Sequence, residues 1–357
     1  MKESLKTPNN QWLYKSASNV LCILLLVDFG SEVNSTDSIN FALPLTFLTE
    51  ESEELQSLAE ALLPGFLSLL ESEKIPASDD VINNHSKLFI PFCNWLVKQK
   101  QKKPLIIGIN GSQGSGKSTL TKILKHILEQ GFNKNVVSLS IDDLYKTKVE
   151  RQQLAEEIHP LFITRGVPGT HDVNLGLSVL NHLLEDNTSE LAIPCFDKAI
   201  DDRLPESQWP KFKGKCDIVL FEGWCVGSIA EHEDSLATPV NTFEQFEDDN
   251  AIWRRFVNQQ LKTKYTELFA LIDLQILLKI PDFNKVFEWR KLQESKLQDN
   301  ITDTKNSVMN EKEINRFIMH FERITKHTLS EMPDRCNIVF EINDNHQINN
   351  VTARCDQ

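Results

Sequence analysis

The stretch Leu105–Leu120, which reads LIIGINGSQGSGKSTL, constrains the fold of this chain more than any other. Its segment Gly111–Ser118 fits the phosphate-binding pattern G-x-x-x-x-G-K-S/T. Glycine tolerates the backbone dihedrals that turn successive N–H groups inward, and the start of the next helix adds to the anion nest. An apolar run of strand length, Leu105–Ile109, precedes the loop, and Lys117–Gln130 has the apolar period of a helix. A Gly/Ser-rich turn that matched by accident would need neither neighbour, so the stretch predicts a nucleoside-triphosphate site.

The pattern assigns a part to each position of the loop. Lys117 would reach the β- and γ-phosphates, and the hydroxyl of Ser118 would hold Mg²⁺. We therefore expect ATP and Mg²⁺ as cofactors. The nucleotide contacts are expected from Gly111, Ser112, Gln113, Gly114, Ser115, Gly116, Lys117, Ser118 and Thr119.

The composition limits the partners of the chain. It has 357 residues with 51 acidic and 38 basic side chains and a formal net charge of −13. Such a chain repels nucleic acid at long range, so we expect no nucleic-acid partner. The apolar run Val20–Val27 is too short for a membrane span and is expected to be a buried element. Seven cysteines without a C-x-x-C pair indicate reduced thiols and a cytoplasmic protein.

The chain divides into two regions at Pro104. Residues 1–103 carry no catalytic pattern, and their helical periods at Glu51–Leu70 and Val81–Lys100 predict a helical appendage. In residues 104–357 strands alternate with helices, which predicts a mainly parallel sheet with right-handed crossovers. Further strands are expected at Val136–Ile141, Leu191–Phe196, Cys216–Phe221, Leu271–Ile280 and Cys336–Ile342, and later helices at Ile252–Phe269, Phe283–Leu297 and Glu311–Lys326.

Acidic residues follow two of the predicted strands. Asp142 comes directly after Val136–Ile141, and Glu222 ends the apolar run Cys216–Phe221. The carboxyl ends of parallel strands form the crevice in which α/β sheets bind ligands. Asp142 could instead cap the next helix, and Glu222 could belong to an ordinary turn. Beside a phosphate loop we favour a catalytic Asp142 and a Glu222 in the Mg²⁺ shell.

Two further segments have the chemistry of a substrate site. The loop Arg165–Asp172, RGVPGTHD, combines glycine and proline with Arg, Thr, His and Asp, a mixture suited to an anionic, hydroxylated substrate. The predicted helix Phe283–Leu297 contains Arg290 among many charges. It could be a lid that supplies this arginine to the phosphates, although a solvated charged face is the more common meaning of such a helix.

Taken together, these motifs resemble the D-glycerate 3-kinase family, a branch of the P-loop kinases that includes phosphoribulokinase, uridine kinase and bacterial pantothenate kinase. The resemblance extends from about Leu88 to about Asn343 and is carried by GINGSQGSGKSTL, SIDDLYKT, HPLFITRGVPGTHDV, IPCFDKAIDDRLP and VLFEGWCVG. It implies a three-layer α/β/α P-loop NTPase fold with a C-terminal helical lid at about residues 283–326. One segment departs from the family pattern, because Ile200–Arg203 lacks the glycine that usually precedes the Asp-Arg pair.

The resemblance also implies roles for individual residues. Asp142 would accept the proton of the attacking hydroxyl, Ser118 and Glu222 would hold Mg²⁺, and Arg290 would come from the lid to act in catalysis with Lys117. The departure at Ile200–Arg203 leaves open whether Arg203 or Arg290 contacts the phosphates. The acceptor pocket would consist of Asp142, Tyr145, Arg165, His171, Asp197 and Lys198.

The sequence therefore predicts an ATP-dependent small-molecule kinase that phosphorylates D-glycerate on its 3-hydroxyl to give 3-phosphoglycerate. One alternative is a kinase of this fold acting on another acceptor, such as pantothenate or a nucleoside like uridine. Another is a nucleotide-hydrolysing switch, which the absence of an N-K-x-D motif and the Gly223 after Glu222 disfavour. A catalytically inactive regulatory protein is disfavoured because Lys117, Ser118 and Asp142 are present. The oligomeric state is not specified, and a monomer is compatible with the sequence.

Overall fold

The computed structural model describes residues 52–99, 103–185, 188–298 and 310–354, all within the compact unit Phe41–Gln357. The run Val20–Val27, expected to be a buried element, lies outside the described residues. None of the described helices combines the length and the apolar character that crossing a membrane requires.

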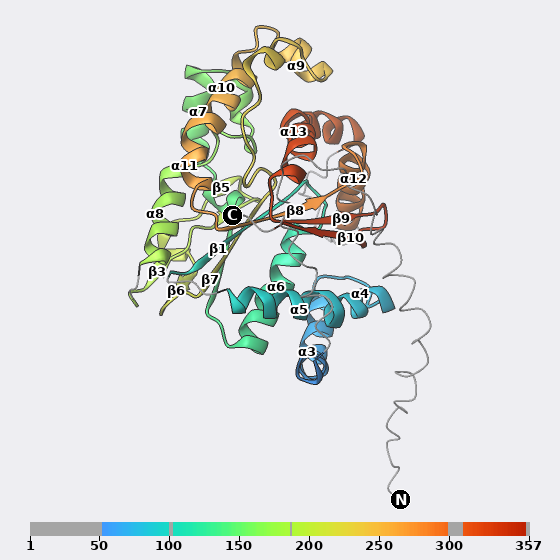
Figure 1. Ribbon diagram of the computed structural model, residues 1–357. Coiled ribbons are helices and arrows are strands. Elements are labelled where there is room, and N and C mark those ends of the chain that lie inside the picture. The colour runs from blue at the N-terminus through green and yellow to red at the C-terminus, as the bar shows by residue number, and fades with distance from the viewer. Residues whose placement is uncertain (1–51, 100–102, 186–187, 299–309, 355–357) are drawn as a thin grey trace, which may run out of the picture. The chain divides into compact units, whose positions relative to one another are not determined.

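A six-stranded sheet lies at the centre of the described unit, in the order β10-β9-β8-β1-β7-β2 (Figure 1). All neighbouring pairs are parallel except β9 and β10. The strands are β1 (Leu105–Gly111), β2 (Val136–Ser140), β7 (Ile218–Gly223), β8 (Leu274–Lys279), β9 (Ile338–Ile342) and β10 (Ile348–Ala353). This arrangement confirms the predicted α/β fold with a mainly parallel sheet.

Two parts of the sheet differ from the prediction. The antiparallel edge strand β10 was not predicted, because its sequence INNVTA is half polar and only Ala353 in it is buried. The predicted strand Leu191–Phe196 is wrong: Pro194, which lacks an N–H to donate, separates two short strands outside the main sheet. These are β3 (Leu191–Ala192), paired with β6 (Lys211–Phe212), and β4 (Phe196–Asp197), paired with β5 (Asp202–Arg203).

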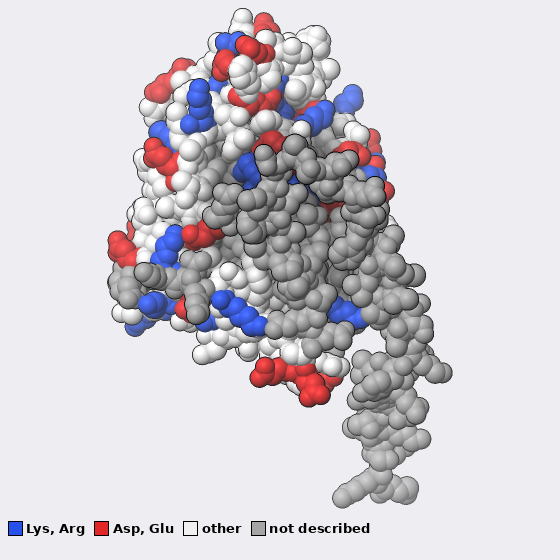
Figure 2. Space-filling model, in the orientation of Figure 1, with Lys and Arg blue, Asp and Glu red and all other residues white. Residues whose placement is uncertain are grey.

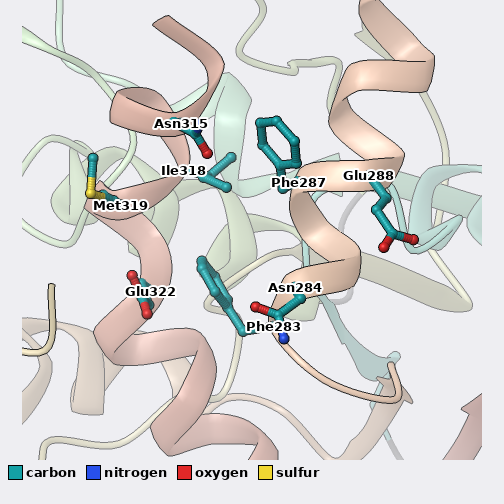
Figure 3. A pocket seen from close by; sticks show the side chains of 8 residues that line it. All are labelled: Phe283, Asn284, Phe287, Glu288, Asn315, Ile318, Met319 and Glu322. Carbon is teal, nitrogen blue, oxygen red and sulfur yellow. The ribbon is translucent and has the colours of Figure 1, made fainter. Parts of the chain in front are cut away.

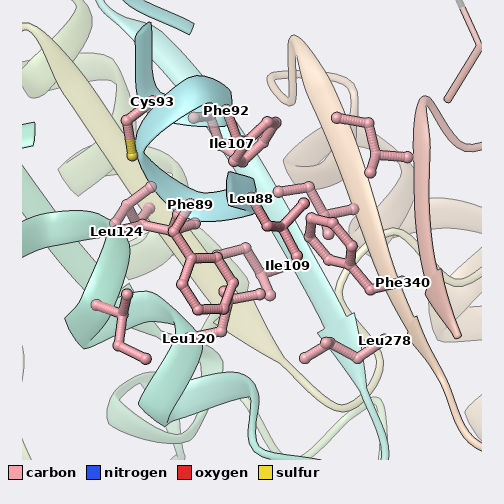
Figure 4. Close-up of a cluster of buried hydrophobic side chains, with 14 of the residues drawn as sticks. Leu88, Phe89, Phe92, Cys93, Ile107, Ile109, Leu120, Leu124, Leu278 and Phe340 are labelled. Atoms are coloured by element: carbon pink, nitrogen blue, oxygen red, sulfur yellow. The ribbon is translucent and has the colours of Figure 1, made fainter. Parts of the chain in front are cut away.

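Alternate residues of the central strands face two separate hydrophobic clusters. In β1, Ile107 and Ile109 belong to one cluster and Ile106 to the other, and in β7 Leu220 and Val219 divide in the same way. Figure 4 shows the first cluster, in which side chains of two helices meet Ile107 and Ile109. Burial on both faces explains why these strands read as continuous apolar runs.

Helices cover each face of the sheet. The first cluster contains side chains of α3 (Glu53–Ser72), η1 (His85–Phe89), α5 (Ile90–Lys98) and α6 (Lys117–Phe132), with α4 (Asp79–Asn84) leading into η1. The helix predicted over Val81–Lys100 is present but contains one π turn, His85–Phe89. Pro91 follows shortly after this turn, and its ring nitrogen cannot donate a hydrogen bond to the preceding turn. The predicted boundary of the appendage at residue 103 stays a prediction, although α3 and α5 share the core of β1.

The other described helices lie between β2 and β9 along the chain. Helices packed in the second cluster include α8 and α11, which contact each other (Figure 1). The bounds are η2 (Ile141–Leu144), α7 (Lys148–Glu157), η3 (Pro160–Ile163), α8 (Val173–Leu184), η4 (Glu206–Gln208), η5 (Glu233–Ala237), α9 (Thr242–Glu247), α10 (Ile252–Gln260), η6 (Leu261–Tyr265), α11 (Thr266–Phe269), α12 (Asn284–Gln298), α13 (Glu311–Glu331) and η7 (Met332–Asp334).

Candidate functional site

The strand order places three predicted site segments side by side. Strand β7 pairs in parallel with β1 on one side and with β2 on the other. The phosphate loop follows β1, Glu222 lies near the end of β7, and Asp142 follows β2. Because parallel strands end at the same edge of a sheet, the three segments meet at one crevice.

The phosphate loop has the backbone that its glycines permit. Gly114 and Gly116 have φ angles of 81° and 89°, in the left-handed region. Helix α6 begins at Lys117, so its free N–H groups point toward the loop. Among the described residues, the hydroxyls of Ser112 and Ser115 are buried without a hydrogen-bond partner. Unpartnered buried donors at a helix N-terminus fit a bound polyphosphate.

Ser118 and Glu222 lie together at the end of β7. The Ser118 hydroxyl donates to Glu222 Oε1 at 2.9 Å, and Glu222 is only 8% exposed. Glu222 Oε2 is buried and has no partner among the described residues. A hydroxyl and a carboxylate with a free oxygen could hold a divalent cation whose other ligands are phosphates and water.

Asp142 is held from two sides. It lies in η2, where Tyr145 donates its hydroxyl to Oδ1 at 2.8 Å and Lys198 donates to Oδ2 at 2.6 Å. Burial raises the pKa of Asp142, but attraction to Lys198 and Lys117 and these two hydrogen bonds outweigh it and lower the pKa to about 2. The carboxylate is therefore ionised at neutral pH and lies within the field of the phosphate-loop lysine.

Asp143 is a site residue that the sequence analysis did not single out. Its Oδ1 accepts the backbone N–H of Phe196 at 3.1 Å. Burial is the main cause that raises its pKa to about 6. The negative charges of Asp142 and Glu222 raise the pKa further, whereas the hydrogen bond from Phe196 lowers it. The signal for it was the DD pair after β2, of which only the first acid received a role.

His171 is buried beside Tyr145, the residue that bonds Asp142. Its ring stacks on Tyr145, with centroids 4.6 Å apart, and its Nδ1 lies 2.6 Å from the hydroxyl of Tyr265. Burial lowers the pKa of His171 to about 3, so the imidazole is neutral at physiological pH. Its Nε2 has no partner in the described part of the chain. The sequence offered no signal for Tyr265, which lies 94 residues away from His171.

Arg165, predicted for the acceptor pocket, and Arg203, left open as a phosphate contact, are both paired with acids of the chain. Arg165 forms an ion pair with Asp201 and lies over the Phe196 ring, 5.4 Å from its centroid. Arg203 is 15% exposed and bonds Asp172 at 3.2 Å. The structure thus brings Arg165 to this side of the site but gives its guanidinium a protein partner.

Asp197 lies on β4, next to Lys198. Its Oδ1 accepts the backbone N–H of Ala199 at 2.8 Å, which stabilises the turn of the hairpin. The hairpin thereby presents Lys198 to Asp142, and Asp197 itself contacts the turn rather than the phosphate loop.

Helix α12 lies against the phosphate loop. A Cβ built on Gly114 would come within 2.8 Å of the Trp289 Cβ, so the helix backbone passes directly over the loop. The Trp289 ring contacts the His346 ring, with centroids 4.1 Å apart and planes tilted by 34°, and the guanidinium of Arg290 lies 5.4 Å from the centre of Phe317 on α13. The lid role of Arg290 stays a prediction, and the contact through Trp289 was not foreseen.

A cavity of about 320 Å³ lies between α12 and α13 (Figure 3). None of the side chains that line it belongs to the phosphate loop or to the predicted acceptor pocket. They are Phe283, Asn284, Phe287, Glu288, Asn315, Ile318, Met319 and Glu322. On the face drawn in Figure 2, acidic and basic side chains of the described residues are interspersed.

Comparison with known proteins identifies several relatives. The chain is 37% identical over 229 residues to the "Uncharacterized kinase mug58" of Schizosaccharomyces pombe, covering 61% of this chain and 79% of that one. It is 27% identical over 226 residues to the chloroplastic D-glycerate 3-kinase of Arabidopsis thaliana, covering 61% of this chain and 46% of that protein. No family model matches the chain.

A solved structure supports the fold. The D-glycerate 3-kinase of Cryptococcus neoformans superposes with a TM-score of 0.60 at 22% identity, covering 85% of this chain and the whole of that chain. At this identity the likeness establishes the shared α/β architecture.

Proposed function

The chain belongs to the P-loop kinase family that includes mug58, and from this premise we propose that it transfers the γ-phosphoryl group of ATP to the 3-hydroxyl of D-glycerate. The observation that carries the proposal is the carboxylate of Asp142, oriented by Tyr145 and Lys198 at the strand end beside the phosphate loop. A nucleotide-hydrolysing switch does not need a second carboxylate that is positioned to accept a hydrogen bond from an alcohol. A kinase needs one to orient the hydroxyl.

In this proposal the phosphate loop binds the triphosphate. The N–H groups of the loop and of the α6 N-terminus surround the phosphate oxygens, and Lys117 neutralises charge on the β- and γ-phosphates. Phosphoryl transfer has a loose transition state with little covalent demand on the protein, so in-line positioning and charge stabilisation supply most of the rate.

Ser118 and Glu222 would hold Mg²⁺. Glu222 has a buried oxygen without a partner among the described residues, and the Ser118 hydroxyl lies 2.9 Å from its other oxygen. Mg²⁺ is usually bound by one or two protein oxygens together with phosphates and water, which fits this pair. When bound, the ion would supply positive charge that neutralises the phosphates.

Asp142 would receive the acceptor hydroxyl. With a pKa of about 2 it is ionised throughout the physiological range, so it can always accept a hydrogen bond from the alcohol. Such a weak base takes the proton late, after the phosphorus–oxygen bond has begun to form, which suits a loose transition state. Tyr145 fixes the orientation of the carboxylate through its 2.8 Å hydrogen bond.

The choice of D-glycerate rests on two supports. One is the similarity to a D-glycerate 3-kinase over 226 residues. The other is the position of Arg165 and Lys198 around the Phe196 segment, because an arginine fork and a lysine suit an acceptor with a carboxylate.

The test is product identification with the full chain, ATP and Mg²⁺. D-glycerate, pantothenate and uridine are supplied separately, and 3-phosphoglycerate is expected only with the first. Lys117→Ala should abolish turnover, and Asp142→Asn should retain ATP binding while losing most of the rate. ADP release that is independent of any acceptor would contradict a kinase, and product with another acceptor alone would contradict D-glycerate.

A further inference from the structure

Asp201 has a backbone conformation that residues other than glycine rarely adopt. Its φ angle is 57°, in the left-handed region. Glycine adopts this region freely, and among the residues with a side chain Asn and Asp do so most often. It lies in the turn of the β4–β5 hairpin, directly before Asp202. Its side chain contacts Arg151 of α7 and Arg165 of the loop that follows η3.

The Asp201 carboxylate bridges two arginines. Its Oδ2 lies 2.9 Å from Arg151 Nη2, and its Oδ1 bonds Arg165 Nη1. Arg151 is 1% exposed and also donates to the carbonyls of Lys146, Ile163 and Asp201. The buried guanidinium thus has three carbonyl partners in addition to the carboxylate, whereas the carboxylate is the charged partner of Arg165.

Arg165 lies on the acceptor side of the site. Its guanidinium covers the Phe196 ring, and that ring packs edge-on against Tyr145 with centroids 5.2 Å apart. Tyr145 in turn bonds Asp142. An anionic acceptor with its hydroxyl at Asp142 would find the Arg165 guanidinium already paired with a carboxylate of the chain.

We propose that Asp201 is a specificity-determining residue that competes with the acceptor's anionic group for Arg165 and so weakens the binding of anionic acceptors. The inference rests on the proposed function, since it takes Arg165 as part of the acceptor site. It assigns to the hairpin a control over acceptor charge that is separate from the binding of ATP. Neutralising Asp201 frees the guanidinium and removes a negative charge that repels the acceptor.

The chain offers a matched control in the next residue. Asp202 has the same charge on the same hairpin, and its Oδ1 accepts the backbone N–H groups of Lys148 and Arg203. Within the described part of the chain, Asp202 makes no hydrogen bond or ion pair with Arg165. Asp201→Asn and Asp202→Asn therefore change the net charge equally, but only the first releases Arg165. Asp201→Gly is a second variant, in which glycine also tolerates the left-handed φ angle.

The first experiment compares steady-state kinetics of the full chain with D-glycerate. Asp201→Asn and Asp201→Gly should lower the KM for D-glycerate about three- to fivefold, the effect of one partly exposed ion pair, with the KM for ATP unchanged. Asp202→Asn should leave the KM for D-glycerate within twofold. A KM that rises or stays constant in both Asp201 variants would overturn the proposal, because the carboxylate would then hold Arg165 in its productive position.

The second experiment does not depend on turnover. Modification of Arg165 by phenylglyoxal, followed by peptide mass spectrometry, should be several-fold faster in both Asp201 variants than in the wild type or in Asp202→Asn. Equal rates in all four proteins would overturn the competition for Arg165 whatever the acceptor is. Faster modification without any turnover of D-glycerate would instead refute the proposed acceptor and leave the ion-pair competition standing.

Discussion

Replacing Gly114 by alanine tests whether α12 rests on the phosphate loop. Two costs are expected. The φ angle of 81° lies in the left-handed region, which costs an L-residue about 1–2 kcal/mol. The new Cβ would also meet the Trp289 Cβ at 2.8 Å, and overpacking of this kind costs about 1–3 kcal/mol because backbone must move. The variant should therefore lose about 2–5 kcal/mol of unfolding free energy.

Gly116→Ala is the matched control for this experiment. Gly116 has a similar φ angle of 89°, but a Cβ built on it meets nothing within 4 Å. It should lose only the conformational cost of about 1–2 kcal/mol. The assay is equilibrium urea unfolding without nucleotide, followed by both tryptophan fluorescence and circular dichroism, so that coincident transitions justify a two-state analysis.

A double-mutant cycle separates the contact from general damage to the loop. The atom that the new methyl meets is the Cβ of Trp289, which Trp289→Ala retains and Trp289→Gly removes. The loss caused by Gly114→Ala should therefore shrink in the Trp289→Gly background and persist in the Trp289→Ala background. Equal losses for the Gly114 and Gly116 variants would refute the reasoning, since α12 would then not rest on the loop.

Two further predictions concern charged groups. Lys198→Met removes the main attraction that lowers the pKa of Asp142 to about 2, so the pKa should rise. In the wild type the ionised Asp142 contributes at most about 2 kcal/mol to the free energy of unfolding above pH 4, and this contribution is lost as the pH falls toward 2. The difference in unfolding free energy between the wild type and Lys198→Met, measured in urea, should therefore disappear between pH 4 and pH 2. Arg323→Met should cost about 3–5 kcal/mol, because the fully buried Glu244 loses its 2.6 Å ion pair and retains a longer 3.9 Å contact with Arg254 and a hydrogen bond from the Val240 N–H. The added change Glu244→Leu should restore much of this loss.

The sequence sufficed for those parts of the site that depend on local backbone geometry. The glycine spacing of the loop, the apolar strand before it and the helix after it fix the position of Lys117 within one continuous segment. Acids directly after buried strands were expected at one crevice, and the order β1-β7-β2 brings Glu222 and Asp142 there. The expectations of a cytoplasmic location and of no nucleic-acid partner stay predictions.

The parts that could not be predicted depend on contacts between distant segments. To predict the strand at Leu191–Phe196 correctly, one would need to know which neighbour it pairs with. Pro194 divides it into two short strands, which pair with β6 and β5. The contact of Trp289 with Gly114 joins positions in α12 and the phosphate loop that no local period connects. Edge strand β10 has too few buried side chains to show the alternation that marks a strand.

The departure at Ile200–Arg203 acquires a physical meaning from the structure. A glycine was expected in this segment, and Asp201 adopts the left-handed φ of 57° that glycine would adopt without strain. The backbone turn is therefore kept while a carboxylate is added, and this carboxylate bonds Arg165 and Arg151. A sequence shows that an arginine is present, but its availability depends on the acid that the fold places beside it. The same holds for Lys198, whose ammonium group is paired with Asp142, so an anionic acceptor meets cations that already have acidic partners at these two positions.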